Sequence, residues 1–279
     1  MSNELREAAA IVRNAAKIVV FTGAGISAES GIPTFRDEPE AHSGNDDTAG
    51  FWHRFPVEEF ATWPGLIRSA RQQPRRVVEF VHHVLAPIAD ARPNPAHHAI
   101  SYLEQERSTT IVTQNIDGLH QAAGSVNVQE LHGSIFEVVT RDRRPVRELD
   151  RAQLSRIAKR LERIRRGWLP IPRMLWAVRR WLGLGWRGLH LPNLVLFGDA
   201  LCEPDWTRGL AAAEACDCLI QIGCSGVVLP AAMLPLAAKS NGARVIAIDP
   251  QPTEADIWLS GSAAQVTPQL VAAALSRQS

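Results

Sequence analysis

Short apolar runs alternate with amphipathic stretches along most of the chain. Apolar, largely β-branched runs of the kind found in buried parallel strands lie at 17–22, 108–114, 126–131, 194–197, 218–223 and 244–249. Around them, apolar residues at helical spacing predict helices over 4–15, 94–106, 205–216, 230–240 and 267–277. Strands that alternate with helices predict an α/β fold, a Rossmann-like open parallel sheet with helices on both faces.

A glycine-rich turn follows the first predicted strand. Gly23, Gly25 and Ala28 give the spacing G-x-G-x-x-A, which suits a tight turn whose backbone N–H groups approach a pyrophosphate. A proline soon afterwards prevents a long helix, so the turn leads into a loop that carries Phe35 and Arg36. These residues are candidates for dinucleotide binding, although an ordinary strand–helix turn would have the same glycines.

Polar residues follow several of the other predicted strands. They are Asn115, Asp117, His132, Ser225 and Asp249. Residues at the carboxyl ends of parallel strands face the ligand crevice of such a sheet, so these side chains are candidates for one binding site. The alternative is structural, because Asn and Asp at strand ends often form turns or cap helices.

Two segments interrupt the alternation of strands and helices. Residues 38–91 are first polar and acidic and then helical with frequent prolines, which predicts a small helical cover over the glycine-rich turn. Residues 141–189 include an arginine-rich amphipathic helix at 151–166 and half of the tryptophans. We therefore predict a main domain of residues 1–140 and 190–279 that contains the cover, and a basic, Trp-rich helical insertion at 141–189.

Composition describes an ordinary globular protein, with 46% hydrophobic and 21% charged residues in a chain of 279. No apolar run is long enough to cross a bilayer. The chain starts with an amphipathic helix in place of an apolar signal core, from which we expect a cytoplasmic protein. The cysteines Cys202, Cys216, Cys218 and Cys224 contain no C-x-x-C pair and are expected to be buried thiols.

Charge is distributed unevenly along the chain. The net charge is +1, yet residues 141–190 hold 15 of the 30 Lys+Arg and only 4 of the 29 Asp+Glu by direct count. A segment so different from the rest of the chain indicates an insertion with a role of its own.

Four segments in the same order resemble the sirtuins, the NAD-dependent protein deacylases. They are GAGISAESGIPTFR at 23–36, TQNIDGLH at 113–120, LHGS at 131–134 and FGDAL at 197–201. The resemblance covers roughly residues 5–140 and 190–275. It implies that NAD is bound and that acyl groups are removed from protein lysines.

The resemblance also implies roles for individual residues. The NAD-binding residues would be Gly23, Ala24, Gly25, Ala28, Phe35, Arg36, Gln114, Asn115, Ile116, Asp117, Gly223, Cys224, Ser225 and Asp249. The acyl-lysine would be bound by Val195, Phe197 and Gly198. Asn115 would order the ribose and a water, while Asp117 with Ile116 would hold the nicotinamide carboxamide. His132 would be the base that takes a proton from a ribose hydroxyl, since an imidazole titrates near neutrality.

In the reaction that the resemblance implies, the acyl oxygen attacks the nicotinamide ribose and nicotinamide leaves. The products are nicotinamide, free lysine and O-acyl-ADP-ribose. The sequence departs from the family pattern at Cys224, Asp249 and Asp199, where Thr, Asn and Glu are usual. The larger departure concerns zinc. Sirtuins usually carry two pairs of cysteines between the catalytic His and the Phe-Gly strand, and this chain has none there. A structural zinc needs four N or S ligands, so we expect no zinc and a module held by helices instead.

Three hypotheses about function stay open at this point. The first is a zinc-free, NAD-dependent lysine deacylase, which the retention of Asn115, Asp117 and His132 favours. The second is an ADP-ribosyltransferase or NAD hydrolase on the same fold, in which another nucleophile or water captures the ribose. The third is an NAD-sensing or nucleic-acid-binding protein without catalysis, which the basic segment suggests.

Two expectations concern ligands. Sirtuins that prefer succinyl or malonyl groups carry a Tyr and an Arg three residues apart, and Val81 and Val84 are the best match here, so we expect an apolar acyl pocket. The basic segment 141–190 has either a solvated outer face or a surface for a polyanion, in which arginines contact phosphates and tryptophans stack. We expect a monomer.

Overall fold

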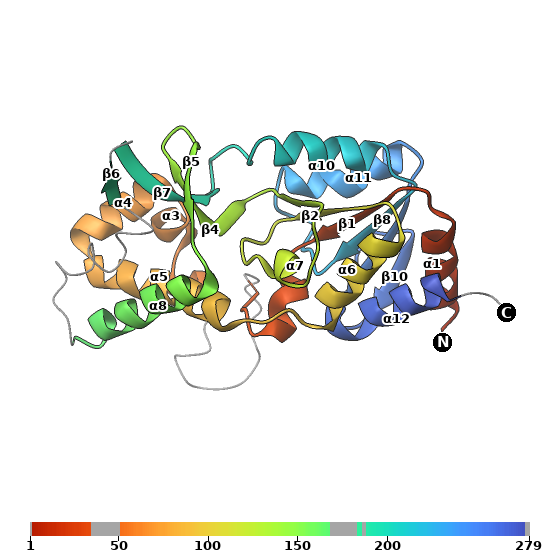
Figure 1. Ribbon diagram of the computed structural model, residues 1–279, viewed down its shortest axis with the longest axis horizontal. Helices are drawn as coiled ribbons and strands as arrows, with labels where there is room; N and C mark the ends of the chain where they lie inside the picture. Colours follow the sequence, from red (N-terminus) through yellow and green to blue (C-terminus); the bar gives the residue numbers. More distant parts are fainter. Residues whose placement is uncertain (1, 35–50, 168–182, 186–187, 277–279) are drawn as a thin grey trace. The chain divides into compact units, whose positions relative to one another are not determined.

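The computed structural model describes residues 2–34, 51–167, 183–185 and 188–276. The chain divides into two compact units, whose elements are labelled in Figure 1. Unit 1 consists of Met1–Thr34, Arg92–His132 and Leu201–Ser279, and unit 2 of Phe35–Ala91 and Gly133–Ala200. The predicted cover and the predicted insertion thus both fall in unit 2. Phe35, Arg36, a helix expected near 174–182 and the tryptophans at 168, 176, 181 and 186 lie outside the described residues.

Unit 1 is built on a six-stranded sheet in which every neighbouring pair of strands is parallel. Its strands are β1 (Ile18–Thr22), β2 (Thr109–Thr113), β3 (Val128–Glu130), β8 (Cys218–Ile222), β9 (Arg244–Asp249) and β10 (Ile257–Ser260). The order is β10-β9-β8-β1-β2-β3. From β1 the chain moves outward to β2 and β3 and later returns on the other side at β8. The direction of winding therefore reverses between β1 and β8, which is where open α/β sheets bind ligands.

Helices cover both faces of this sheet (Figure 1). One face carries α1 (Asn3–Asn14), α6 (Pro95–Glu106) and α12 (Ala263–Leu275), and the other carries α10 (Asp205–Glu214) and α11 (Leu234–Ser240). The first face forms a hydrophobic core, in which Val20, Ile111 and Ile220 of the central strands pack with Leu103 and Leu270 of the helices. The predicted Rossmann-like sheet with helices on both faces is confirmed.

Unit 2 combines helices with an antiparallel sheet. The helices are α2 (Phe51–Arg54), α3 (Val57–Phe60), α4 (Trp63–Gln72), α5 (Pro74–Asp90) and α8 (Arg151–Arg165). The strands β4 (Gly133–Thr140), β5 (Pro145–Glu148), β6 (Gly183–Gly185) and β7 (Gly188–Leu194) pair in the order β5-β4-β7-β6. The predicted amphipathic helix is α8, which begins at the cap Asp150 and packs along α5.

Several predicted elements differ from those observed. Residues 141–189 were expected to be helical, and they contain β5, β6 and the start of β7 besides α8. The strand predicted at 194–197 ends at Leu194 and begins earlier, because its pairing with β4 sets its limits. Helix α12 begins at Ala263, before the predicted start, and has Pro268 in its interior. No helix of the described residues is both long and apolar enough to cross a membrane.

Candidate functional site

Three glycines bring two distant turns into backbone contact at the point between β1 and β8. The N–H of Gly25 donates to the carbonyl of Gly223 at 3.0 Å. A Cβ at Gly25 would lie 2.6 Å from Gly223 Cα, and one at Gly23 would lie 2.8 Å from Gly223 O. Gly223 itself has φ +60°, in the left-handed region that favours glycine. Any side chain at these positions would force the two turns apart.

The turn after β1 continues into a short 3-10 helix, η1 (Ala24–Ser30), rather than into a long one. Gly25 is half-buried and Ala28 is exposed, while Ser27 between them is fully buried. The chain then reaches Gly31, whose left-handed backbone ends the helix. The short helix predicted from the proline downstream is therefore present, and it aims Ser27 into the site.

Ser27, Asn115 and Asp117 form one hydrogen-bonded cluster beside this turn. The side-chain amide of Asn115 donates to Gly23 O and to Ser27 Oγ, each at 3.1 Å. The Ser27 hydroxyl in turn donates to Asp117 Oδ2 at 2.7 Å. Both N–H bonds of the amide are then used, so Asn115 Oδ1 is left as an acceptor. Asp117 Oδ1 accepts from the N–H of Leu119 at 2.9 Å, which fixes the carboxylate where α7 (Leu119–Ala122) starts.

His132 lies directly after the strand β3 and its ring is anchored on one side. Its Nδ1 is 2.8 Å from the carbonyl oxygen of Gln114. A carbonyl oxygen only accepts, so Nδ1 carries the proton and Nε2 keeps a lone pair in the neutral ring. Burial lowers the pKa of His132 below its ordinary value, and the hydrogen bond to Gln114 opposes that shift. The ring is thus held as a neutral base near pH 7.

The remaining unit 1 residues of the prediction lie at strand ends as expected. Cys224 is buried and its thiol points back to the carbonyls of Phe21 and Ile222 at 3.6 and 3.5 Å. Ser225 is exposed. Asp249 is buried at the end of β9, and its Oδ1 accepts from the N–H of Gln251 at 3.0 Å.

The candidate acyl-lysine residues Val195, Phe197 and Gly198 belong to unit 2 and follow β7. Phe197 is 53% exposed, and its N–H donates to the carbonyl of Ala61 at 2.8 Å. Asp199 closes the turn, because its Oδ2 accepts from Leu196 N at 3.0 Å and from the indole N–H of Trp63 at 2.9 Å. Asp199 is shorter than the Glu usual at this position, and these local hydrogen bonds hold it in place.

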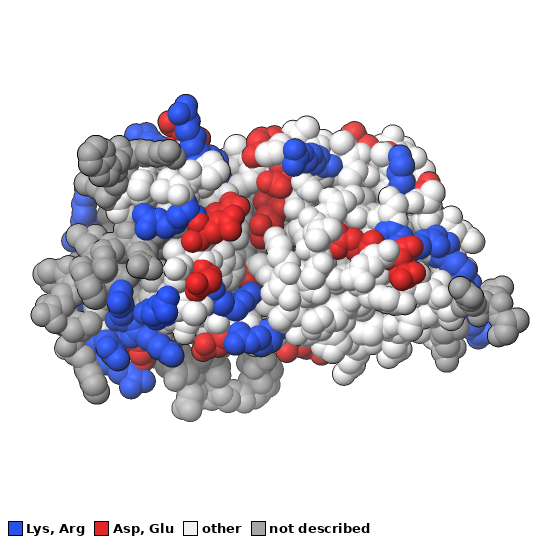
Figure 2. Space-filling model, viewed as in Figure 1, with Lys and Arg blue, Asp and Glu red and all other residues white. Residues whose placement is uncertain are grey.

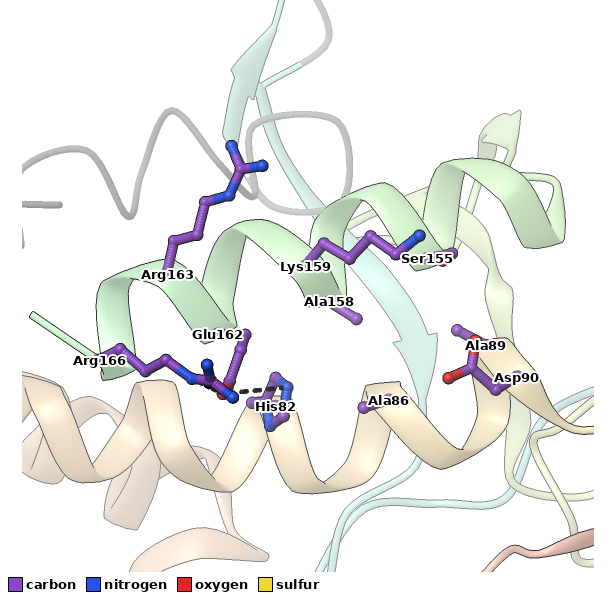
Figure 3. Close-up of a pocket in the computed structure, with 10 residues that line it drawn as sticks. All are labelled: His82, Ala86, Ala89, Asp90, Ser155, Ala158, Lys159, Glu162, Arg163 and Arg166. Carbon is purple, nitrogen blue, oxygen red and sulfur yellow. Dashed lines mark hydrogen bonds and ion pairs between the residues drawn. The ribbon is translucent and has the colours of Figure 1, made fainter. Parts of the chain in front are cut away.

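A pocket lies within unit 2, between α5 and α8. Figure 2 shows Lys and Arg side chains gathered over α8, and Figure 3 shows the pocket of about 360 Å³ beneath them. Glu162 projects into it and is 3.3 Å from His82 Nε2. Hydrogen bonds from Arg165 lower the pKa of Glu162 to about 2, with a further contribution from Arg166. In the described part of the chain, Lys159 and Arg163 form no ion pair, so this helix keeps unneutralised positive charge.

Sequence reasoning missed several buried polar residues of unit 1. Ser27 lies inside the glycine motif and His120 inside TQNIDGLH, yet neither was singled out as a site residue. Thr22 and Thr113 at strand ends and His97 of α6 were not identified as site residues either, because a buried Thr or His has no distinctive sequence signal. Only the paired distances between elements reveal that they form a network.

The chain was compared with known proteins and families. The model of the Sir2 family matches residues 23–230. A protein of Desulfosudis oleivorans named NAD-dependent protein deacylase is 36% identical over 279 aligned positions, which cover 97% of this chain and 96% of that protein.

Two solved structures of similar fold carry ligands. A Sir2 homologue in complex with NAD is 32% identical, with a TM-score of 0.72 and coverage of 97% of this chain and 93% of the other. A Sir2 protein bound to a myristoylated histone peptide is 30% identical, with a TM-score of 0.67 and coverage of 98% and 97%.

Proposed function

The chain belongs to the Sir2 family, and from that premise we propose that it is an NAD-dependent protein-lysine deacylase. The name of the Desulfosudis relative and the NAD and acyl-peptide complexes of the similar structures support this activity. One observation of the chain itself carries the proposal. A histidine whose Nε2 can accept a proton belongs to the same unit as a backbone cradle and the Ser27–Asn115–Asp117 cluster.

The residues of this site fit NAD. A Cβ on any of the glycines in contact around Gly223 would collide with the opposite turn. Glycines are expected at such positions where a backbone must approach a pyrophosphate. Asn115 Oδ1 can accept from a ribose hydroxyl or a water, and the Asp117 carboxylate can accept from a carboxamide. When bound, NAD supplies the ribose carbon from which nicotinamide leaves and to which the acyl oxygen is joined.

The chain's own residues then provide proton transfer and orientation. Gln114 O holds the proton of His132 on Nδ1, so Nε2 can accept a proton from a ribose hydroxyl. Asn115 is fixed through both N–H bonds and can order its partner without rearranging. The expected products are free lysine, nicotinamide and O-acyl-ADP-ribose.

The decisive experiment incubates the protein with NAD and acyl-lysine peptides and resolves the products by mass spectrometry. We expect free lysine peptide and O-acyl-ADP-ribose in equal amounts. ADP-ribose formed without any peptide would instead indicate an NAD hydrolase, and a protein or peptide that gains ADP-ribose would indicate a transferase. NAD binding without turnover would indicate an NAD-sensing protein and would contradict the proposal.

A surface for polyanions on α8 is a second proposal for this chain. Its buried side is apolar, with Leu154, Leu161 and Ile164, while its outer side carries Lys159 and Arg163. Glu162 pairs with Arg165 and Arg166, and Lys159 and Arg163 form no ion pair with a described residue. Unpaired basic side chains on one helix face suit contact with phosphates.

Reversing Lys159 and Arg163 to Glu should abolish binding to single-stranded DNA at low salt, while peptide deacylation survives. The binding of the unchanged protein should weaken steeply as salt rises, because phosphate contacts release counterions. Arg71 and Arg75 of the same unit are also exposed, and their reversal is the matched control. Binding that tolerates the α8 change, or no binding by the unchanged protein, would refute a DNA-contacting role. The monomeric state and the cytoplasmic location stay predictions.

A further inference from the structure

Four buried polar side chains of unit 1 lie in a row beneath the loop that carries Asn115. They are His97 of α6, His120 of α7, Thr22 of β1 and Thr113 of β2, and all are 2% exposed or less. The rings of His97 and His120 have centroids 5.1 Å apart. His120 Nε2 is 3.0 Å from Thr22 Oγ1, which is 2.8 Å from Thr113 Oγ1. The row ends where Thr113 Oγ1 accepts from the backbone N–H of Asn115 at 3.0 Å.

The partners of the first ring fix its tautomer. The backbone N–H of Asn94 donates to His97 Nδ1 at 3.3 Å, so the neutral ring carries its proton on Nε2. That Nε2 is buried and has no hydrogen-bond partner among the described residues, and neither has Nδ1 of His120. The two rings therefore pack against each other without a hydrogen bond between them, and the hydrogen-bonded part of the row begins at His120 Nε2.

We propose that His120, Thr22 and Thr113 form a hydrogen-bonded relay that positions Asn115, with the ring of His97 packed against His120. In it, His120 Nε2–H is donated to Thr22, and the Thr22 hydroxyl is donated to Thr113. Thr113 Oγ1 accepts from both the Thr22 hydroxyl and the backbone N–H of Asn115. The three relay residues are positioning residues, since none contacts the cluster except through Asn115.

Two features make the relay more than packing. Burial lowers the pKa of His97 to about 3 and that of His120 to about 4, so both rings stay neutral and keep their donor–acceptor polarity near pH 7. Thr109, at the other end of β2, is also buried, but its hydroxyl has no described partner. Burial of a threonine on this strand therefore does not by itself give its hydroxyl a hydrogen-bond partner, whereas the hydroxyl of Thr113 has partners.

The first test measures, in the unaltered protein, which ring nitrogen of each histidine carries the proton. With ¹⁵N-labelled histidine, long-range NMR spectra near pH 7 should show both rings neutral with the proton on Nε2. A proton on Nδ1 of His120, or a charged ring, would overturn the proposal. This measurement needs neither NAD nor turnover, so its outcome is separate from that of the proposed deacylase activity.

The second test compares three variants of β2. Thr113→Val keeps the shape but removes the hydroxyl, and should weaken NAD binding and lower kcat/KM about 5- to 100-fold, the cost of an unpaired buried N–H. Thr113→Ser should restore both, and Thr109→Val should leave both unchanged. The effect on kcat/KM rests on the proposed function, whereas the loss of NAD affinity does not.

A loss of NAD affinity in Thr113→Val that Ser does not restore would indicate a packing role and contradict the relay. Unchanged affinity in Thr113→Val would contradict it too. Should Thr113→Val fail to fold, His120→Gln provides the second variant, since its terminal amide can still donate to Thr22. The relay then requires that His120→Gln retains more NAD affinity than His120→Leu.

Discussion

At the scale of single residues, His132 is the group whose chemistry is best defined. Its Nδ1–H bond to Gln114 O leaves one nitrogen for proton transfer. His132→Ala should lower deacylation about 10²–10⁴-fold, the usual contribution of a general base, while NAD binding and the fold persist. Peptide turnover and calorimetric NAD titration measure the two effects. His53→Ala, which changes an exposed histidine of unit 2, is the control, and full activity in His132→Ala would refute the assignment.

The buried histidines His97 and His120 also make stability depend on pH. Burial is the main cause of their low pKa values, about 3 and about 4. In the unfolded chain these two histidines have a pKa near 6.5, so below that pH the unfolded chain binds more protons than the folded chain. The free energy of unfolding is therefore fully maintained above pH 6.5 and falls by up to about 1.4 kcal/mol per pH unit for each histidine as pH drops toward 4.

Urea unfolding at pH 7 and pH 5 measures this dependence. His120→Asn removes one titrating group, so the difference between the two pH values should shrink relative to the unaltered protein. His98→Asn, at the exposed neighbour of His97, should leave the difference unchanged. An equal pH dependence in all three proteins would contradict the buried, neutral state of His120.

The residues that the sequence identified at the site are those with distinctive motifs. Gly23, Asn115 and His132 occur in the segments that resemble the sirtuins, and each lies at a strand end in unit 1. Thr113 was missed because its role depends on a partner on another strand, namely Thr22. Contacts between elements distant in sequence leave no periodic trace, so only coordinates reveal them.

At the scale of elements, the strength of the hydrophobic pattern decided which strands and helices could be predicted from the sequence. Strands buried on both faces, such as β1 and β8, read as apolar runs and were predicted within about a residue of their ends. Strand β5 is mostly exposed, with the residues PVRE, so neither alternation nor an apolar run marks it. The sheet of unit 2 was therefore missed, although α8 was found from its apolar face.

The predicted acyl preference concerns two residues of helix α5. Val81 and Val84 lie on it, half-buried, where a succinyl-preferring sirtuin would place a Tyr and an Arg. Without a guanidinium, an acyl carboxylate would lose its hydration without gaining a charge partner. Acetyl and longer acyl peptides should therefore react faster than succinyl peptides, which kcat/KM values across a peptide panel will show. Faster turnover of the succinyl peptide would refute this prediction.

At the scale of the whole molecule, the open question is what stabilises unit 2. The stretch between His132 and Phe197 contains no cysteine, and we propose that the apolar face of α8 against α5 takes the place of a metal. The purified protein should then hold no stoichiometric zinc, and chelators should not lower its melting temperature, since chelation unfolds modules that depend on zinc. Elemental analysis that finds one zinc per chain would contradict this.

Unit 1 places its first strand in the middle of the sheet, with β2 on one side and β8 on the other. During synthesis, β1 and β2 emerge long before β8, so for much of that time one edge of β1 lacks its neighbour. An open, apolar strand edge is a template for wrong pairing. The contact between Gly25 and Gly223 likewise cannot form until β8 has emerged. A nascent chain therefore acquires its nucleotide cradle and loses its most aggregation-prone edge in the same late step of folding.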